Sequence, residues 1–200
     1  MVSTATSNAI TLRGSTAIVT EFFSYAINSI LYQRGTYPPH MFKPEKKYGL
    51  TLLTTSDSAL QEYLLSVLDQ TERWLMTGAV QKLVVVISSA IDQSTLERWV
   101  FNVEHEPSSS TKSSSKSEKQ IQSEIQAILR QITASVTFLP LIDDPCTFEL
   151  LCYTNIDADV PTMWEESNPK YIENSEEVKL RSFSTSIHKV GTEVSFRTIE

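Results

Sequence analysis

The chain has 200 residues, 40% of them hydrophobic, which suits a single globular domain with a buried core. Its formal net charge of −7 lies entirely after residue 142, where 5 Lys and Arg face 12 Asp and Glu. Such an acidic segment repels phosphate groups, so the composition argues against general nucleic-acid binding and fits a basic peptide better.

The sequence carries no leader of charged residues followed by apolar ones and no apolar run of about 18 residues, so we expect neither export nor membrane spanning. We therefore expect a location in the cytosol or nucleus. Cys146 and Cys152 are six residues apart on one expected strand. This spacing separates them by roughly 20 Å, which is too far for a disulfide.

Two amphipathic helices are expected in the first 80 residues. The first covers 16–32 and ends before Gly35, and a short strand is expected at 50–54 after a segment rich in Pro and Gly. The second helix is expected to begin at a capping box of Ser58 and Gln61 and to end before Gly78. Its apolar stripe consists of Leu60, Tyr63, Leu64, Val67, Leu68, Thr71, Trp74 and Leu75.

Two strands are expected next. Residues 80–87 are almost all apolar and β-branched, which predicts a central strand covered on both faces. Residues 96–103 place Trp99, Phe101 and Val103 on one face, and a turn before them favours a hairpin.

The serine-rich segment 106–119 is expected to be a flexible surface loop that interrupts the fold without dividing it. A third helix is expected over 118–137, with a capping box of Ser117 and Gln120. The apolar side of this helix consists of Ile121, Ile125, Ile128, Leu129, Ile132 and Val136. A strand is expected after it, at 146–154.

The stretch "EEVKLRSFSTSIHKV" at 176–190 has an apolar alternation that slips by one residue between Leu180 and Phe183. Because side chains alternate faces in a strand, the slip requires a bulge, a bend or two separate strands. One hypothesis is a movable terminal segment that exposes or covers a sheet edge. A fixed hairpin with one bulge is the alternative.

Residues suited to catalysis are not grouped in the sequence. His40, His105 and His188 lie in unrelated contexts, and no glycine-rich phosphate loop is present. The carboxylate pairs at 143–144 and 165–166 fit solvated loops better than acid and base catalysis. We therefore expect no enzyme, no cofactor and no metal site, and a binding function instead.

Long stretches of the chain resemble the spindle-checkpoint proteins of the HORMA family, from Ile10 to Val190. Among them are "VTEFFSYAINSILYQRGTYP", "KKYGLTLL", "VQKLVVVIS", "RQITASVTFLPL" and "NSEEVKLRSFSTSIHKV". The resemblance implies an α+β fold in which three helices pack on a mainly antiparallel sheet. It implies one HORMA domain over 1–200, with a core of about 10–154 and a mobile C-terminal safety belt of about 155–200.

The resemblance also implies open and closed conformers. In the open form the belt covers an edge strand, and in the closed form it wraps a partner peptide that pairs with that strand. The implied edge strand consists of Phe148, Glu149, Leu150, Leu151, Cys152, Tyr153 and Thr154. The implied belt residues are Trp164, Phe183, Ile187, His188 and Val190; the dimer residues are Arg130, Gln131 and Phe138; and the switch residues are Leu12 and Trp74.

The implied function is that of a checkpoint adaptor that inhibits the anaphase-promoting complex by capturing its activator subunit. The implied partners are that activator, the coiled-coil checkpoint scaffold at kinetochores, a second copy in an open–closed dimer, and an AAA+ remodeller with its HORMA adaptor. Neither nucleic acid nor membrane is among them. The implied location is nucleus, kinetochore and cytoplasm. The alternative is a related HORMA adaptor of a DNA-repair polymerase or of the meiotic chromosome axis.

Overall fold

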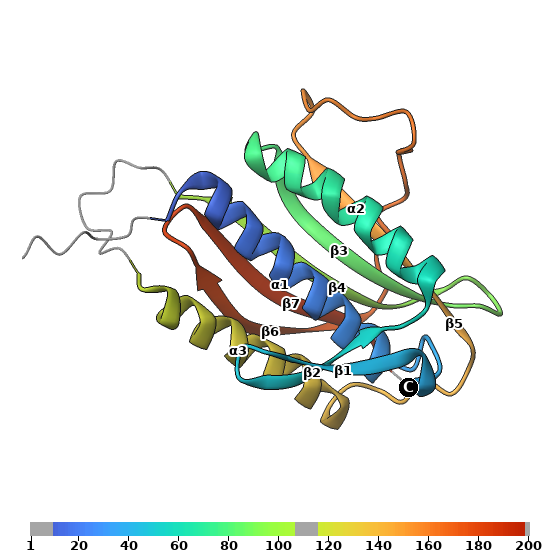
Figure 1. Ribbon diagram of the computed structural model, residues 1–200. Coiled ribbons are helices and arrows are strands. Elements are labelled where there is room, and N and C mark those ends of the chain that lie inside the picture. The colour runs from blue at the N-terminus through green and yellow to red at the C-terminus, as the bar shows by residue number, and fades with distance from the viewer. Residues whose placement is uncertain (1–9, 107–115, 199–200) are drawn as a thin grey trace, which may run out of the picture.

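The computed structural model describes residues 10–106 and 116–198. In this part of the chain, five antiparallel strands form one sheet in the order β5-β3-β4-β7-β6. Figure 1 shows α1 and α2 lying across one face of this sheet and α3 running alongside β6. The sheet strands are β3 (Val80–Ser89), β4 (Thr95–His105), β5 (Cys146–Thr154), β6 (Ser175–Ser184) and β7 (His188–Arg197).

The three helices are α1 (Leu12–Gln33), α2 (Ser58–Met76) and α3 (Glu118–Ala134). The capping box predicted for α3 is confirmed, because Ser117 and Gln120 bond each other's backbone N–H groups. The cap predicted for α2 is wrong. Asp57 holds that position, and its carboxylate accepts a hydrogen bond from the N–H of Leu60.

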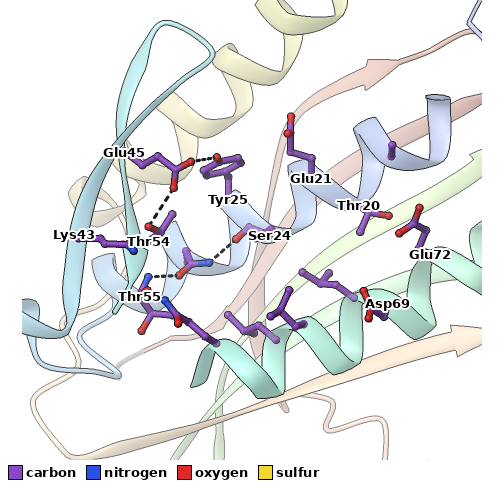
Figure 2. A pocket seen from close by; sticks show the side chains of 16 residues that line it. Thr20, Glu21, Ser24, Tyr25, Lys43, Glu45, Thr54, Thr55, Asp69 and Glu72 are labelled. Carbon is purple, nitrogen blue, oxygen red and sulfur yellow. Dashed lines mark hydrogen bonds between the residues drawn. The ribbon is translucent and has the colours of Figure 1, made fainter. Parts of the chain in front are cut away.

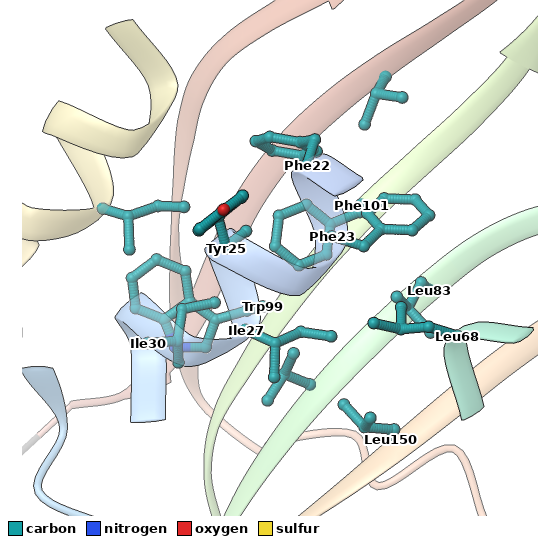
Figure 3. Packing of buried hydrophobic residues seen from close by; sticks show 14 of the residues in the cluster. Phe22, Phe23, Tyr25, Ile27, Ile30, Leu68, Leu83, Trp99, Phe101 and Leu150 are labelled. Carbon is teal, nitrogen blue, oxygen red and sulfur yellow. The ribbon is translucent and has the colours of Figure 1, made fainter. Parts of the chain in front are cut away.

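The hydrophobic core lies between the helices and the sheet, as Figure 3 shows for Phe22, Phe23 and Phe101. β6 contributes Phe183, whose ring centroid lies 4.9 Å from that of Phe22. Truncating a buried aromatic side chain of this kind to alanine typically costs about 3–5 kcal/mol. The last strands of the chain are therefore part of the core in this arrangement, together with Val190, Val194 and Phe196.

A small hairpin of β1 (Phe42–Lys47) and β2 (Leu50–Thr55) lies outside the main sheet. The strand expected at 50–54 is confirmed, whereas β1 was not expected, because its side chains are mostly exposed and show no alternation. Val136 is also placed differently from the prediction. It is 44% exposed, because α3 gives way to a 3₁₀ turn at Ser135–Thr137.

The phase slip before Phe183 has a clear structural cause. The register of β6 against β7 shifts between Lys179 and Ser182, so Leu180 and Arg181 together face one residue of β7. The pattern left a bulge, a bend or two separate strands open; the structure has the bulge, and a tight turn then separates β6 from β7. The serine-rich loop predicted at 106–119 lies largely outside the described residues.

Candidate functional site

β5 is the outermost strand of the sheet and pairs only with β3 within the described residues. The terminal hairpin, formed by β6 and β7, lies at the opposite end of the strand order, where β7 pairs with β4. The outer edge of β5 therefore presents unpaired backbone N–H and C=O groups, which can take an additional strand from another chain. All seven implied edge-strand residues, 148–154, lie on β5.

Aromatic side chains line one side of this edge. The ring of Phe148 lies edge-on to Tyr37 and to Tyr63, with centroid distances of 6.0 and 5.8 Å. Leu150 is buried and also contributes to the core. Partial burial raises the pKa of the Tyr63 hydroxyl.

The crossing segment, residues 155–174, connects β5 to β6 and contains no helix or strand. Figure 1 shows it in orange, arching beside α2 before the chain returns to β6. Trp74 on α2 donates its indole N–H to the carbonyl oxygen of Asp159 at 2.8 Å. The ring of Trp164 packs edge-on against Trp74, with a centroid distance of 4.8 Å. The implied switch residue and the implied belt residue are therefore brought into contact.

The rest of the crossing segment is attached to the sheet itself. Lys170 Nζ lies 3.1 Å from a carboxylate oxygen of Glu149 on β5. Tyr171 then stacks under the guanidinium of Arg98, at 4.7 Å. Arg98 neighbours the core residue Trp99 on β4, so it points to the opposite face of the sheet from the helices. The segment thus passes the outer edge of β5 and crosses the helix-free face.

A groove of about 550 Å³ lies between α2, β5 and the crossing segment. Tyr63, Leu150 and Trp164 line its apolar part, and the side chain of Met163 is 87% exposed beside them. Exposed apolar side chains around an unpaired strand edge are typical of a protein or peptide interaction site.

The turn of the terminal hairpin docks on the N-terminal turn of α1. His188 Nδ1 lies 2.7 Å from the Ser15 hydroxyl, which also contacts the hydroxyl of Thr185. Burial lowers the pKa of His188, and the nearby ring of His105 acts in the same direction. Ser15 and His188 are 0% and 1% exposed, so a substrate cannot reach this serine–histidine pair in the arrangement described.

The other implied residues lie in different places. Arg130 is exposed on α3, and Phe138 is 43% exposed just beyond it. Gln131 instead contacts the terminal hairpin, where its side-chain oxygen accepts a hydrogen bond from the N–H of Arg181 at 2.7 Å. Leu12 is the first residue of α1 and is half-buried.

Of the implied belt residues, Phe183 and Val190 are core residues. The carbonyl of Ile187 accepts a hydrogen bond from the backbone N–H of Glu106.

A second groove of about 520 Å³ lies between α1, α2 and the β1–β2 hairpin (Figure 2). Two of its carboxylates are already bonded: Glu45 accepts a hydrogen bond from the Tyr25 hydroxyl, and Glu21 accepts one from Lys47. Asn28 joins α1 to the N–H of Thr55. These bonds dock the hairpin on α1, which indicates a structural role for this groove.

Tyr37, Tyr63, Asp159 and Lys170 were not among the residues expected at the site. Only Lys170 carried a signal, because it is a lone basic residue within an acidic stretch. Among the described residues, no group of three or more His, Cys, Asp or Glu side chains is arranged to hold a metal ion. None of the helices in this part of the chain has the length and hydropathy needed to cross a membrane.

Comparisons with known proteins agree with this architecture. Residues 15–188 match the family model of the HORMA domain. The chain is 55% identical over 189 residues to the mitotic spindle assembly checkpoint protein MAD2A of Dictyostelium discoideum, covering 94% of this chain and 93% of that protein. It is 55% identical over 190 residues to the protein of the same name from Homo sapiens, with the same coverage.

A chain in the crystal structure of the mitotic checkpoint complex has a similar fold. The TM-score is 0.85 and the sequence identity 44%, over 93% of this chain and 100% of that one. The similarity thus extends over nearly the whole chain, including the strands that flank the crossing segment.

Proposed function

Because the chain belongs to the HORMA-domain family, we propose that it is a spindle-assembly-checkpoint adaptor that captures a partner peptide between β5 and the crossing segment. One observation carries this proposal: the outer edge of β5 has no strand partner in the described residues, and the crossing segment passes beside it. A captured peptide adds a strand to this edge and inserts its side chains into the groove lined by Tyr63 and Trp164.

In this proposal the arrangement described is the closed conformer, because the terminal hairpin pairs with β4 and leaves the outer edge of β5 without a strand partner in the described residues. In the open conformer the terminal hairpin leaves β4 and covers the outer edge of β5, so that a peptide cannot pair there. Conversion requires breaking the bonds that hold β7 on β4 and the turn on Ser15 before new ones form. A barrier of this kind makes conversion slow even where the two conformers differ by a few kcal/mol.

The acidic surroundings favour a ligand with a basic residue followed by aliphatic residues. Glu149 lies on the edge strand, Glu165 lines the groove, and Leu150 offers an apolar contact. A basic side chain of the ligand can pair with Glu165, because Glu149 is already paired with Lys170, while aliphatic side chains occupy the groove. This chemistry suits the two peptide partners that we propose, the activator of the anaphase-promoting complex and the kinetochore scaffold.

Capture of the activator inhibits the anaphase-promoting complex, and no chemical step is needed for it. We therefore assign the protein a non-enzymatic role, at kinetochores and in the nucleus and cytoplasm. A second copy in the other conformer binds through the exposed surface around Arg130 and Phe138. An AAA+ remodeller with its own HORMA adaptor is the proposed machinery for reopening the belt.

A role in a DNA-repair polymerase or on the meiotic chromosome axis is not favoured. Both relatives with 55% identity are named as spindle checkpoint proteins, and the similar solved chain comes from the mitotic checkpoint complex. A binding comparison between a checkpoint-activator peptide and a meiotic axis peptide separates the two roles. Preference for the meiotic peptide would reverse the assignment.

The proposal predicts two folded species of equal mass. Ion-exchange chromatography should separate them, and a basic-aliphatic peptide should convert one into the other because it binds only the closed conformer. A peptide of the same length with its basic residue changed to glutamate is the control. Release should be slow, since the crossing segment must reopen first. A single species under all conditions, with a peptide that exchanges within milliseconds, would indicate a static groove.

A further inference from the structure

β6 is the other outermost strand of the sheet, and its outer edge has no strand partner in the part of the chain that the structure describes. Helix α3 packs along this edge instead, as Figure 1 shows. Two polar side chains of α3 bond backbone N–H groups of β6. Gln131 accepts from Arg181 at 2.7 Å, and Glu124 accepts from Ser184 at 3.2 Å.

The contact of Gln131 coincides with the bulge of β6. Arg181 is one of the two residues that fall outside the regular ladder between Lys179 and Ser182. A bulge leaves an N–H without its ladder partner, and backbone donors in folded proteins almost always find another acceptor. The amide oxygen of Gln131 supplies that acceptor, so the bulge and the helix fit together at this point.

Glu124 is held in position by a second interaction. Lys116 Nζ bonds both of its carboxylate oxygens, at 2.8 and 2.9 Å. The hydroxyl of Ser184 donates to the carboxylate of Glu106 at 3.2 Å. Ser184 thus lies between a carboxylate of α3 and one just after β4, with its N–H directed to the first and its hydroxyl to the second. A hydrogen bond to an ionised acceptor is stronger than one between neutral groups.

We propose that Gln131 and Glu124 are positioning residues that hold the terminal hairpin at the far edge of the sheet and thereby set the balance between the closed and open conformers. The inference rests on the proposed function, since it requires that the hairpin leave this edge in the open conformer. In that conformer neither side chain has Arg181 or Ser184 beside it, so both contacts favour the closed conformer alone.

α3 also has an anchor that is separate from these two contacts. The helix is held by its apolar face, formed by Ile121, Ile125, Ile128, Leu129 and Ile132. Gln131 neighbours Arg130, which belongs to the proposed dimer surface. A partner that binds around Arg130 therefore lies next to Gln131, whose hydrogen bond to Arg181 requires the terminal hairpin to be at this edge.

The test compares Gln131→Leu with Gln131→Glu. Leucine has a similar size but no acceptor, whereas glutamate keeps a side-chain oxygen. Gln122→Leu is the control, because Gln122 is exposed on the same helix and bonds only Glu118 among the described residues. Amide hydrogen exchange of Arg181 is measured in the isolated closed species, and ion exchange gives the ratio of closed to open protein at equilibrium.

Gln131→Leu should accelerate exchange at Arg181 and lower the ratio of closed to open protein about five-fold, the effect of one hydrogen bond. Gln131→Glu should retain most of both properties, and Gln122→Leu should match the unaltered protein. Ser184→Asp should lower the ratio as well, because it places a third carboxylate beside Glu124 and Glu106, and high salt should reduce this effect.

Unchanged exchange at Arg181 in Gln131→Leu would overturn the inference, because the contact would then contribute nothing. Faster exchange with an unchanged ratio would overturn it too, since Gln131 would then be a local packing residue. Both outcomes leave two species and so leave the proposed function intact. A single species of the unaltered protein would instead refute the conformational switch of the proposed function and, with it, the balance inferred for Gln131.

Discussion

Trp74 and Asp159 are joined by a hydrogen bond from the indole N–H to the backbone carbonyl oxygen, 2.8 Å long. The bond connects α2, which is buried against the core, to the crossing segment just after it leaves β5. Trp164 packs on the same indole ring. The end of the crossing segment near the groove is therefore fixed by one tryptophan on a rigid helix.

Replacing Trp74 with phenylalanine removes the N–H and keeps an aromatic ring. We expect a bound peptide to dissociate about five-fold faster, because one hydrogen bond of about 1 kcal/mol no longer holds the crossing segment closed. Release of a fluorescent peptide measures this. Trp99→Phe is the matched control: it also loses an indole hydrogen bond from a buried tryptophan, but to Glu97 on the same strand, β4. An unchanged release rate in Trp74→Phe would argue against this anchor.

Lys170 and Glu149 form the second attachment of the crossing segment, and their side chains are 28% and 36% exposed. Ion pairs this exposed contribute about 0.2–1 kcal/mol, so Lys170→Met should speed peptide release by no more than about five-fold. The effect should vanish near 1 M salt, where the screening length is about 3 Å. Lys189 of the terminal hairpin forms a comparable pair with Glu104 of β4. Lys189→Met breaks that pair and should not affect peptide release in this way. A salt-independent change would rule out an electrostatic origin.

Arg130→Ala should weaken self-association without loss of peptide binding. The residue is exposed on α3, whereas the peptide edge lies at the other end of the sheet. Arginine is enriched at interface hot spots, where truncation costs about 2 kcal/mol or more, roughly a 30-fold weaker dimer. Sedimentation velocity measures the dimer, with Lys119→Ala, also on α3, as control. Unchanged dimer content would refute the assignment.

His188 should make the closed conformer sensitive to acid. Burial lowers its pKa in the folded protein, with a further contribution from His105 on β4, and Ser15 of α1 faces its Nδ1. The unfolded chain then binds a proton more readily than the folded one. The stability that neutral His188 provides is therefore complete above the ordinary pKa of about 6.5 and is lost as the pH falls towards the lowered value.

Urea unfolding of the peptide-bound protein between pH 7 and pH 5 measures this loss, whose slope for one group is at most about 1.4 kcal/mol per pH unit. His188→Gln should flatten the profile over this range, because glutamine does not titrate. His40→Gln is the control, since His40 is exposed. Parallel profiles for the His188 variant and the unaltered protein would show that another group is responsible.

Local patterns in the sequence predicted the three helices and the strands β3, β4 and β5, because each pattern reflects burial on one face of its own element. The phase slip before Phe183 was found in the same way, and the structure shows that a bulge causes it. The strand β1 was not predicted, because its mostly exposed side chains show no alternation and its extended form depends on pairing with β2. The N-cap of α2 at Asp57 was not predicted either, because whether Asp57 or Ser58 caps the helix depends on the backbone angles of the two residues.

By itself, the sequence determined most of the elements, the resemblance to the HORMA family and the candidate edge strand. Only the tertiary structure decided which strand the terminal hairpin joins. Arg34 and Glu97 are bonded across 63 positions, and Ser15 and His188 across 173. Backbone groups are alike at every strand edge, so local sequence does not select the partner. The selection comes from the summed packing of buried side chains such as Phe183, which are brought together only when the whole chain has folded.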